Sequence, residues 1–187
     1  MNEQGDFHPE SPCSTFRGLA LLVHVVDRLL GPGGCPWDQK QTHESLKKYL
    51  LEESYELFDA IDAGDLNQIR EEIGDVLLQA VMHSQIEKLA GNWDIEDVAQ
   101  TTAEKLIRRH PHVFGTTEVA DAEEVLRNWD AIKREEKGTP TSILAGVPRS
   151  MPGLSRAHTL SVRAARAGFE WPNEEGVWEK LEEELAE

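Results

Sequence analysis

The sequence has few residues of the kinds that mark secreted or membrane proteins. It contains two cysteines, Cys13 and Cys35, which are too few for a disulfide framework and lack CxxC spacing. No apolar run approaches the roughly 20 residues of a membrane span. Residues 1–14 lack the basic start and apolar stretch of a signal peptide. We therefore expect a cytoplasmic protein with free thiols and no membrane partner.

Positive charge is also scarce. The 187 residues include 19 Lys and Arg against 35 Asp and Glu, a formal net charge of −16. Binding to a nucleic-acid polymer depends on excess Lys and Arg, so this class of partner is excluded. A phosphate ligand would have to arrive with a metal cation. The length suits one domain with a good core plus a fragment of a second.

The chain is organised around an acidic stretch at residues 50–79, LLEESYELFDAIDAGDLNQIREEIGDVLLQ. It holds two acidic clusters, EExxE at 52–56 and EExxD at 71–75, on either side of a turn signal at Gly64. Apolar residues at helical spacing flank this turn, which predicts two antiparallel helices joined at Gly64.

The acidic residues are placed symmetrically about Gly64. Glu56 and Glu72 each lie eight positions from it, and Glu53 and Asp75 each lie eleven. In an antiparallel hairpin these pairs face each other at levels roughly 12 and 16 Å from the turn. Four converging carboxylates repel one another, and a divalent cation between them is the usual solution.

Glu53 argues most strongly for a site, because it interrupts an apolar stripe. The first hairpin helix is expected from a cap at Thr42 to about Asp62. Its apolar stripe consists of Leu46, Leu50, Leu57 and Ile61. A carboxylate inside that stripe is costly unless it is paired or metal-bound. Glu56 lies about 60° to one side, and Glu52 lies further round, where it could reach a bound water.

The second hairpin helix is expected from a cap at Asp65 to about Ala90. Glu72, Asp75 and Gln79 border one edge of its apolar face. This border position suits a site between the two helices.

Other helices are expected over residues 16–30, 94–109 and 121–137. Between the first of these and the hairpin lies an irregular loop that contains Trp37. A tryptophan there either anchors the loop to the core or offers a flat face to a base or ribose.

One compact basic cluster lies at the end of the helix over 94–109. Its cations are Lys105, Arg108 and Arg109. Cations favour a helix C-terminus in any protein, and the functional alternative is that these bind phosphate oxygens. Trp129 and Lys133 share one face of the next helix, either as core packing or as substrate contacts.

The composition divides the chain into four parts. Residues 1–15 look like a disordered leader, 16–137 form the main domain, and 138–153 are a Gly-, Pro- and Ser-containing linker. Residues 154–187 are expected to form two helices, 154–167 and 174–187, and the chain's last five residues repeat the EExxE pattern. We interpret this part as the start of an incomplete internal repeat.

Several motifs together resemble the MazG family of nucleoside triphosphate pyrophosphohydrolases over roughly residues 17–137. They are GGCPWDQKQTHESL, the EExxE and ExxD motifs, and KLIRRHPHVFG. VPRSMPGLSRA followed by GFEW is similar to the linker and second half of two-repeat MazG proteins. The resemblance implies an all-α bundle with an antiparallel acidic helix hairpin and a four-helix core completed by homodimerisation.

The resemblance also implies an activity and a set of site residues. The activity is Mg²⁺-dependent hydrolysis, with Mn²⁺ as a substitute, of NTPs or dNTPs to the monophosphate and pyrophosphate, in nucleotide-pool housekeeping. The metal ligands would be Glu53, Glu56, Glu72 and Asp75. At matching positions, the resemblance implies substrate contacts by Lys105, Arg109, Trp129 and Lys133. From the residues themselves we add Trp37 and Arg108 as candidate substrate contacts, and either Glu52 or Glu53 as the group that orients the attacking water.

Three alternatives bear on this interpretation. A di-iron bundle requires Glu-x-x-His, but the residues three positions after Glu53 and Glu72 are Glu56 and Asp75, so a hard ion is favoured. A non-catalytic helical dimerisation or adaptor module would use the acids for solubility. A phosphohydrolase for another pyrophosphate substrate would share the metal site and differ in its pocket.

Overall fold

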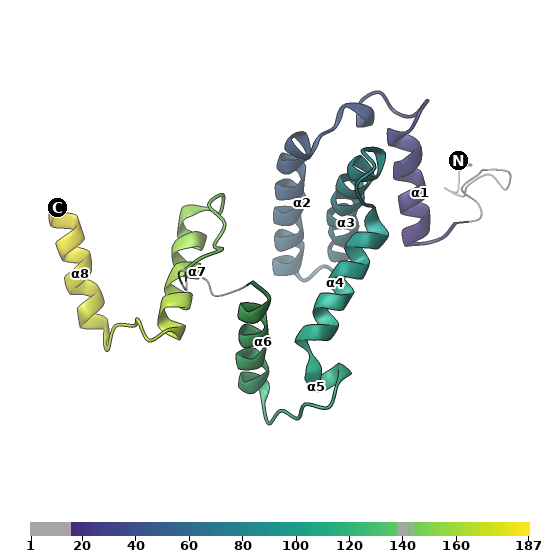
Figure 1. Ribbon diagram of the computed structural model, residues 1–187. Coiled ribbons are helices and arrows are strands. Elements are labelled where there is room, and N and C mark those ends of the chain that lie inside the picture. The colour runs from purple at the N-terminus through teal and green to yellow at the C-terminus, as the bar shows by residue number, and fades with distance from the viewer. Residues whose placement is uncertain (1–15, 138–141, 143) are drawn as a thin grey trace. The chain divides into compact units, whose positions relative to one another are not determined.

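The structure, a computed structural model, describes residues 16–137, 142 and 144–187 (Figure 1). The predicted leader, residues 1–15, and linker residues 138–141 and 143 lie outside this range. All regular secondary structure in the described residues is helical, which confirms the all-α prediction. The chain divides into two compact units, Met1–Leu106 and Ile107–Glu187.

The first unit is built on an antiparallel hairpin. Helices α2 (His43–Ala63) and α3 (Leu66–Leu89) lie side by side, and α1 (Leu19–Leu30) packs against α3 (Figure 1). The chain reverses at Gly64, whose φ of 69° is left-handed and suits a residue without a Cβ. The 3₁₀ turn η2 (Asp38–Lys40) lies in the loop between α1 and α2.

Local capping signals set the helix starts. The Thr42 hydroxyl accepts from the Ser45 amide at 3.1 Å in a capping box. Asp65 accepts from the Asn67 and Gln68 amides at 2.9 and 3.3 Å. Asp94 caps α4 (Ile95–Arg109) in the same way. The predicted starts of these three helices are therefore confirmed.

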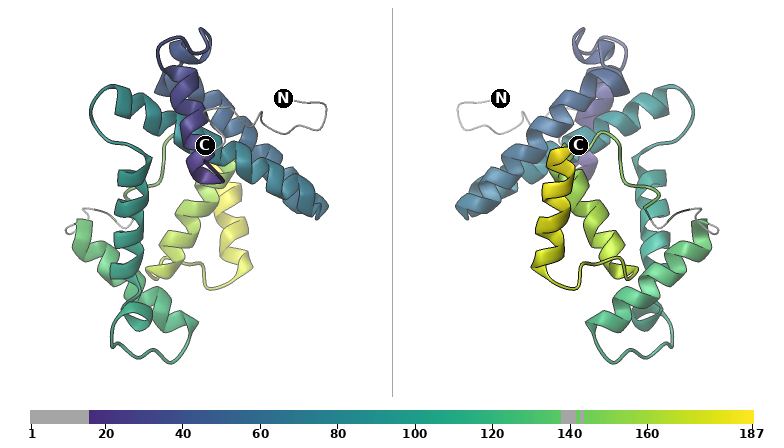
Figure 2. Two further views of the ribbon diagram at one scale, coloured as in Figure 1. Left: turned by 90° about the vertical axis from the view of Figure 1, so that its right-hand side faces the viewer. Right: turned by 90° about the vertical axis from the view of Figure 1, so that its left-hand side faces the viewer.

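The core of the first unit lies at one end of the hairpin only. It is formed by α1 together with the start of α2 and the second half of α3, through Val26, Leu30, Leu46, Val81 and Met82. The turn end extends beyond α1 (Figure 2), and residues 61–68 are exposed. Within the predicted apolar stripe, Leu46 is buried, whereas Leu50 and Ile61 are exposed because no other helix of the first unit covers them.

The second unit contains shorter helices. They are α5 (Pro111–Phe114), α6 (Ala122–Lys137), α7 (Gly153–Arg166) and α8 (Glu174–Ala186). The predicted helices over 121–137, 154–167 and 174–187 are therefore present, whereas α5 was not expected. Pro111 favours this short helix because its fixed φ suits the first helical position. No helix in the described parts of the chain is long and apolar enough to cross a membrane.

A hydrogen-bonded chain of three side chains ties the start of α2 to α3. His43 Nδ1 lies 2.7 Å from His83 Nδ1, and His43 Nε2 lies 2.5 Å from the Glu87 carboxylate. The two rings are nearly parallel, at 12°, but their nitrogens are closer than the roughly 3.5 Å of stacked atoms, so they meet edge to edge. Asn92 donates to the other Glu87 oxygen at 2.6 Å.

This chain of hydrogen bonds should make the first unit sensitive to acid. Burial and the neighbouring His43 lower the pKa of His83, and the hydrogen bonds from His43 and Asn92 lower the pKa of Glu87. Lowered pKa values mean that the unfolded chain binds these protons more readily. The stabilisation is therefore present at neutral pH and is lost as pH falls. A proton on both facing nitrogens would also break the bond between His43 and His83.

We expect the melting temperature of the wild type to fall by a few degrees more between pH 7.5 and 5.5 than that of His83→Asn, which does not titrate in this range. Melting curves of both proteins by circular dichroism measure this difference. The acidic hairpin residues contribute equally to the change in both proteins, so the difference between the two falls cancels their contribution. Equal falls in the two proteins would contradict the prediction.

Candidate metal centre

Three carboxylates converge between the hairpin helices. Glu53 and Glu56 on α2 and Glu72 on α3 each place one ligand oxygen within 4.8 Å of the others. The left-handed Gly64 turn sets this register, because it reverses the chain with the two acidic clusters at equal distances along it. The structure therefore brings together three of the four acids that the symmetry predicted.

Asp75 and Glu52 lie close enough to act on these carboxylates electrostatically. Burial raises the pKa of Glu53 first, and the negative charge of Asp75 raises it further. Glu56, Glu72 and Glu52 contribute in the same direction. Burial, followed by Glu56 and Asp75, likewise raises the pKa of Glu72. The site thus holds excess negative charge that disfavours its own ionisation.

The environment of Glu72 indicates that a cation fits this site. Its Oε2 atom is buried and has no hydrogen-bond partner among the described residues. No ion pair among the described residues neutralises Glu53, Glu56, Glu72 or Asp75. A buried carboxylate oxygen without a donor is costly, and a cation is the partner that relieves this cost. The all-oxygen donor set fits a hard divalent ion such as Mg²⁺ or Mn²⁺.

Trp37 anchors its loop to the hairpin and remains partly exposed. Its ring meets Tyr49 on α2 edge to face, with centroids 5.9 Å apart. The residue is 54% exposed. The Lys48 ammonium lies 4.4 Å from the centroid of the Tyr49 ring, which adds a positive charge beside this aromatic pair.

In the second unit the predicted arginines gather around a carboxylate that the sequence did not single out. Arg108 Nε donates to Glu136 at 2.7 Å, and Arg109 donates to its other oxygen at 2.6 and 3.0 Å. The Arg109 guanidinium also lies 5.2 Å from the Trp129 ring, which His110 contacts edge to face. Hydrogen bonds from Arg109 and then Arg108 lower the pKa of Glu136.

The remaining basic residues of the predicted site are half-buried. Lys105 lies on the part of α4 that belongs to the first unit, and Lys133 lies one turn after Trp129 on α6. Glu136 was missed because its pairing depends on tertiary structure: the two arginines precede it by 28 and 27 residues.

The sequence places Gln79 on α3 at the border of the apolar face, but its environment in the structure is unusual. It is 6% exposed, and its carboxamide oxygen has no hydrogen-bond partner in the described structure. A glutamine in an apolar helix face, one turn beyond a site acid, is the signal that could have singled it out.

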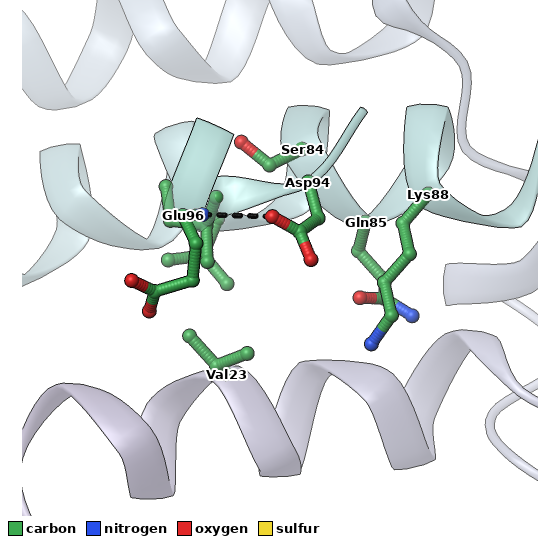
Figure 3. Close-up of a pocket in the computed structure, with 8 residues that line it drawn as sticks. Val23, Ser84, Gln85, Lys88, Asp94 and Glu96 are labelled. Atoms are coloured by element: carbon green, nitrogen blue, oxygen red, sulfur yellow. Dashed lines mark hydrogen bonds between the residues drawn. The ribbon is translucent and has the colours of Figure 1, made fainter. Parts of the chain in front are cut away.

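A hollow lies between α1 and α3 beside the start of α4 (Figure 3). Most of its polar side chains already have partners. Gln85 and Lys88 both donate to Asp27, at 2.6 and 3.2 Å, and the Asp94 carboxylate accepts from the Glu96 amide at 2.9 Å. We therefore assign it no ligand, in contrast to the acidic hairpin.

Known proteins of one family are similar to this chain in sequence and fold. A MazG nucleotide pyrophosphohydrolase domain model matches residues 41–114. The chain is 49% identical over 167 residues to the nucleoside triphosphate pyrophosphohydrolase/pyrophosphatase MazG of Thermotoga maritima. It is 40% identical over 169 residues to the nucleoside triphosphate pyrophosphohydrolase of Escherichia coli K12. Each match covers 89% of this chain but 64% of the relative, so the chain spans just under two thirds of their length.

A solved structure agrees with the sequence matches. The crystal structure of a mazG-related protein from Thermotoga maritima superposes with a TM-score of 0.52 at 30% identity, over 60% of this chain and 96% of that one. The matched sequence includes the acidic hairpin of α2 and α3, which carries the converging carboxylates. The chain therefore belongs to the MazG nucleotide pyrophosphohydrolase family.

Proposed function

We propose that this chain hydrolyses NTPs or dNTPs between the α and β phosphates, releasing the monophosphate and pyrophosphate. The observation that carries the proposal is the convergence of Glu53, Glu56 and Glu72, in which one oxygen of Glu72 is buried without a hydrogen-bond donor. The names of the curated relatives support the same reaction class. We place the activity in nucleotide-pool housekeeping in the cytoplasm.

The hairpin acids would hold the metal and orient the water. Glu53, Glu56, Glu72 and Asp75 are the proposed ligands of Mg²⁺, with Mn²⁺ as a substitute. A bound Mg²⁺ supplies positive charge that neutralises the triphosphate beside an acidic protein. Glu52 is exposed and adjacent to Glu53, so either carboxylate could accept a hydrogen bond from the attacking water.

The basic and aromatic residues would bind the rest of the substrate. Arg108 and Arg109 present guanidinium groups to Glu136, and a phosphate could take the place of that carboxylate because both are bidentate acceptors. Further phosphate or base contacts are proposed for Trp37, Lys105, Trp129 and Lys133. Trp37 and Trp129 provide flat faces that stack on any base.

We also propose that the chain forms a homodimer through the uncovered part of the hairpin. The exposed apolar residues there include Leu51, Tyr55, Phe58, Ile61, Ile73 and Leu77. A second copy would complete a four-helix core over 16–137. The two helices of 154–187 would belong to a second repeat.

The reaction is tested by its products. With Mg²⁺ and a panel of canonical and modified NTPs and dNTPs, we expect pyrophosphate and the monophosphate as the primary products. Coupled assays specific for pyrophosphate and for orthophosphate distinguish the bond that is cleaved. Orthophosphate as the primary product would refute cleavage between the α and β phosphates.

The exposed apolar face equally suits the second candidate, a non-catalytic dimerisation or adaptor module. Melting curves separate the two functions. For the enzyme, Mg²⁺ should raise the melting temperature, and an α,β-methylene dNTP should raise it further, since both bind the folded state. The increase from Mg²⁺ should shrink as pH falls, because protons compete for carboxylates whose pKa is raised. No response to either ligand would favour the adaptor.

A further inference from the structure

Gln79 lies on the same face of α3 as the acids of the metal centre. It follows Glu72 by seven residues and Asp75 by four, so it is about one turn beyond Asp75 and within about 20° of Glu72 around the helix axis. It is 6% exposed, and its Oε1 atom has no hydrogen-bond partner among the described residues. Glu72 and Gln79 thus present two unpaired, buried oxygens on one helix face, about 10 Å apart along the axis.

An unpaired amide oxygen in this position is unfavourable for the isolated chain. Burying an amide without a hydrogen bond has a desolvation cost, and methionine or leucine would fill a helix face without this cost. No hydrogen bond from the described residues to this oxygen accounts for its burial. A donor supplied by a ligand would remove the cost, as a cation would for Glu72.

The surroundings of Gln79 suit the nucleoside end of a substrate. Tyr49 precedes Gly64 by fifteen positions and Gln79 follows it by fifteen, so the two residues lie at the same level of the hairpin. The ring of Tyr49 is in edge-to-face contact with the exposed Trp37. Aromatic faces stack on every base and discriminate little, whereas a carboxamide accepts a hydrogen bond only from a donor.

We propose that Gln79 is a specificity-determining residue whose carboxamide oxygen accepts a hydrogen bond from the nucleoside part of the substrate. This inference rests on the proposed function, because it places the phosphates at Glu53, Glu56 and Glu72. The donor is an amino or imino N–H of the base or a hydroxyl of the sugar. A site built to bind such a donor rejects analogues that lack it far more strongly than an apolar pocket does.

The test replaces Gln79 by methionine, which has a similar shape and no amide. We expect kcat/KM for the best nucleotide to fall by up to about tenfold, mainly through KM, with the preference among substrates compressed. If the donor is on the base, the ranking of the four dNTPs flattens. If it is on the sugar, all four fall together, and nucleotides that lack the relevant hydroxyl do not change.

A matched control and a second readout keep the outcomes distinct. Gln68→Met changes an exposed glutamine on the same helix and should leave every value unchanged. The melting temperature of Gln79→Met should be equal to or above that of the wild type, because no internal hydrogen bond is lost. A preserved substrate ranking, with every kcat/KM within twofold of wild type, would overturn the proposal.

Binding measurements distinguish a wrong role for Gln79 from a wrong reaction. Titration calorimetry with Mg²⁺ and the α,β-methylene analogues of the four dNTPs measures Kd without hydrolysis. If the wild type releases no pyrophosphate but binds the analogues, and Gln79→Met binds them more weakly or with less selectivity, the role of Gln79 stands and the reaction does not. Equal Kd values in the two proteins, or no binding by the wild type, would refute the assignment of Gln79.

Discussion

Glu53→Gln should reduce Mg²⁺-dependent pyrophosphate release by about 1,000-fold or more in kcat/KM. Glu53 converges with Glu56 and Glu72, and burial together with Asp75 raises its pKa, so its charge lies where a cation is needed most. Glutamine keeps the shape of the side chain and removes that charge. Steady-state kinetics at several Mg²⁺ concentrations measure the loss, and excess Mg²⁺ should not restore the rate.

The same substitution should not harm the fold. Because the folded state raises the pKa of Glu53, the ionised carboxylate destabilises the metal-free protein at neutral pH. The neutral amide should therefore melt at the same temperature as the metal-free wild type or above it. The increase in melting temperature that Mg²⁺ gives the wild type should be lost. Together these results would separate a metal ligand from a residue needed for folding.

Glu71→Gln is the matched control. Glu71 is exposed, lies next to Glu72 and undergoes the same change in charge, yet it is not part of the converging set. Its activity should stay within about twofold of wild type, as expected for a surface substitution. Asp75→Asn should lose activity as Glu53→Gln does. Wild-type turnover in Glu53→Gln, or equal losses in Glu53→Gln and Glu71→Gln, would contradict the site assignment.

The hairpin could be predicted because its determinants are local. Thr42 and Asp65 supply hydroxyl and carboxylate caps to amides within three residues, and Gly64 supplies the left-handed turn between them. With the turn fixed, counting residues along two helices is enough to place Glu56 opposite Glu72. Helix geometry is regular over such short distances, so the convergence of the acids follows from the spacing.

Other features depend on contacts that sequence spacing does not encode. The pairing of Arg108 and Arg109 with Glu136 requires α6 to return to the end of α4 after a loop and a short helix. The missing partner of Gln79 appears only once the packing around α3 is known. Periodicity identified Leu50 and Ile61 as apolar-face residues, but it could not say that no other helix of the first unit covers them.

The exposed apolar face of the hairpin predicts a dimer interface. Leu51, Tyr55 and Phe58 follow one another at i, i+4 and i+7, which places them in one stripe on α2. All three are exposed, Phe58 to 56%, and the rings of Tyr55 and Phe58 meet edge to face at 6.0 Å. A contiguous apolar patch of this kind marks an interaction site. The proposed occupant is the same hairpin of a second copy.

Phe58→Asp should convert the protein from a dimer to a monomer of 21.0 kDa, since an unpaired carboxylate in an apolar interface weakens association on the order of 100-fold or more. Sedimentation equilibrium across a range of concentrations measures the mass. Activity should fall with the dimer, because Phe58 is two residues from Glu56 and the hairpin would lose its support on that side.

Phe114→Asp, at a phenylalanine that is 61% exposed on α5, is the control and should remain dimeric. A dimeric Phe58→Asp, or a wild type that sediments as a monomer at every concentration, would show that this apolar face is not the dimer interface.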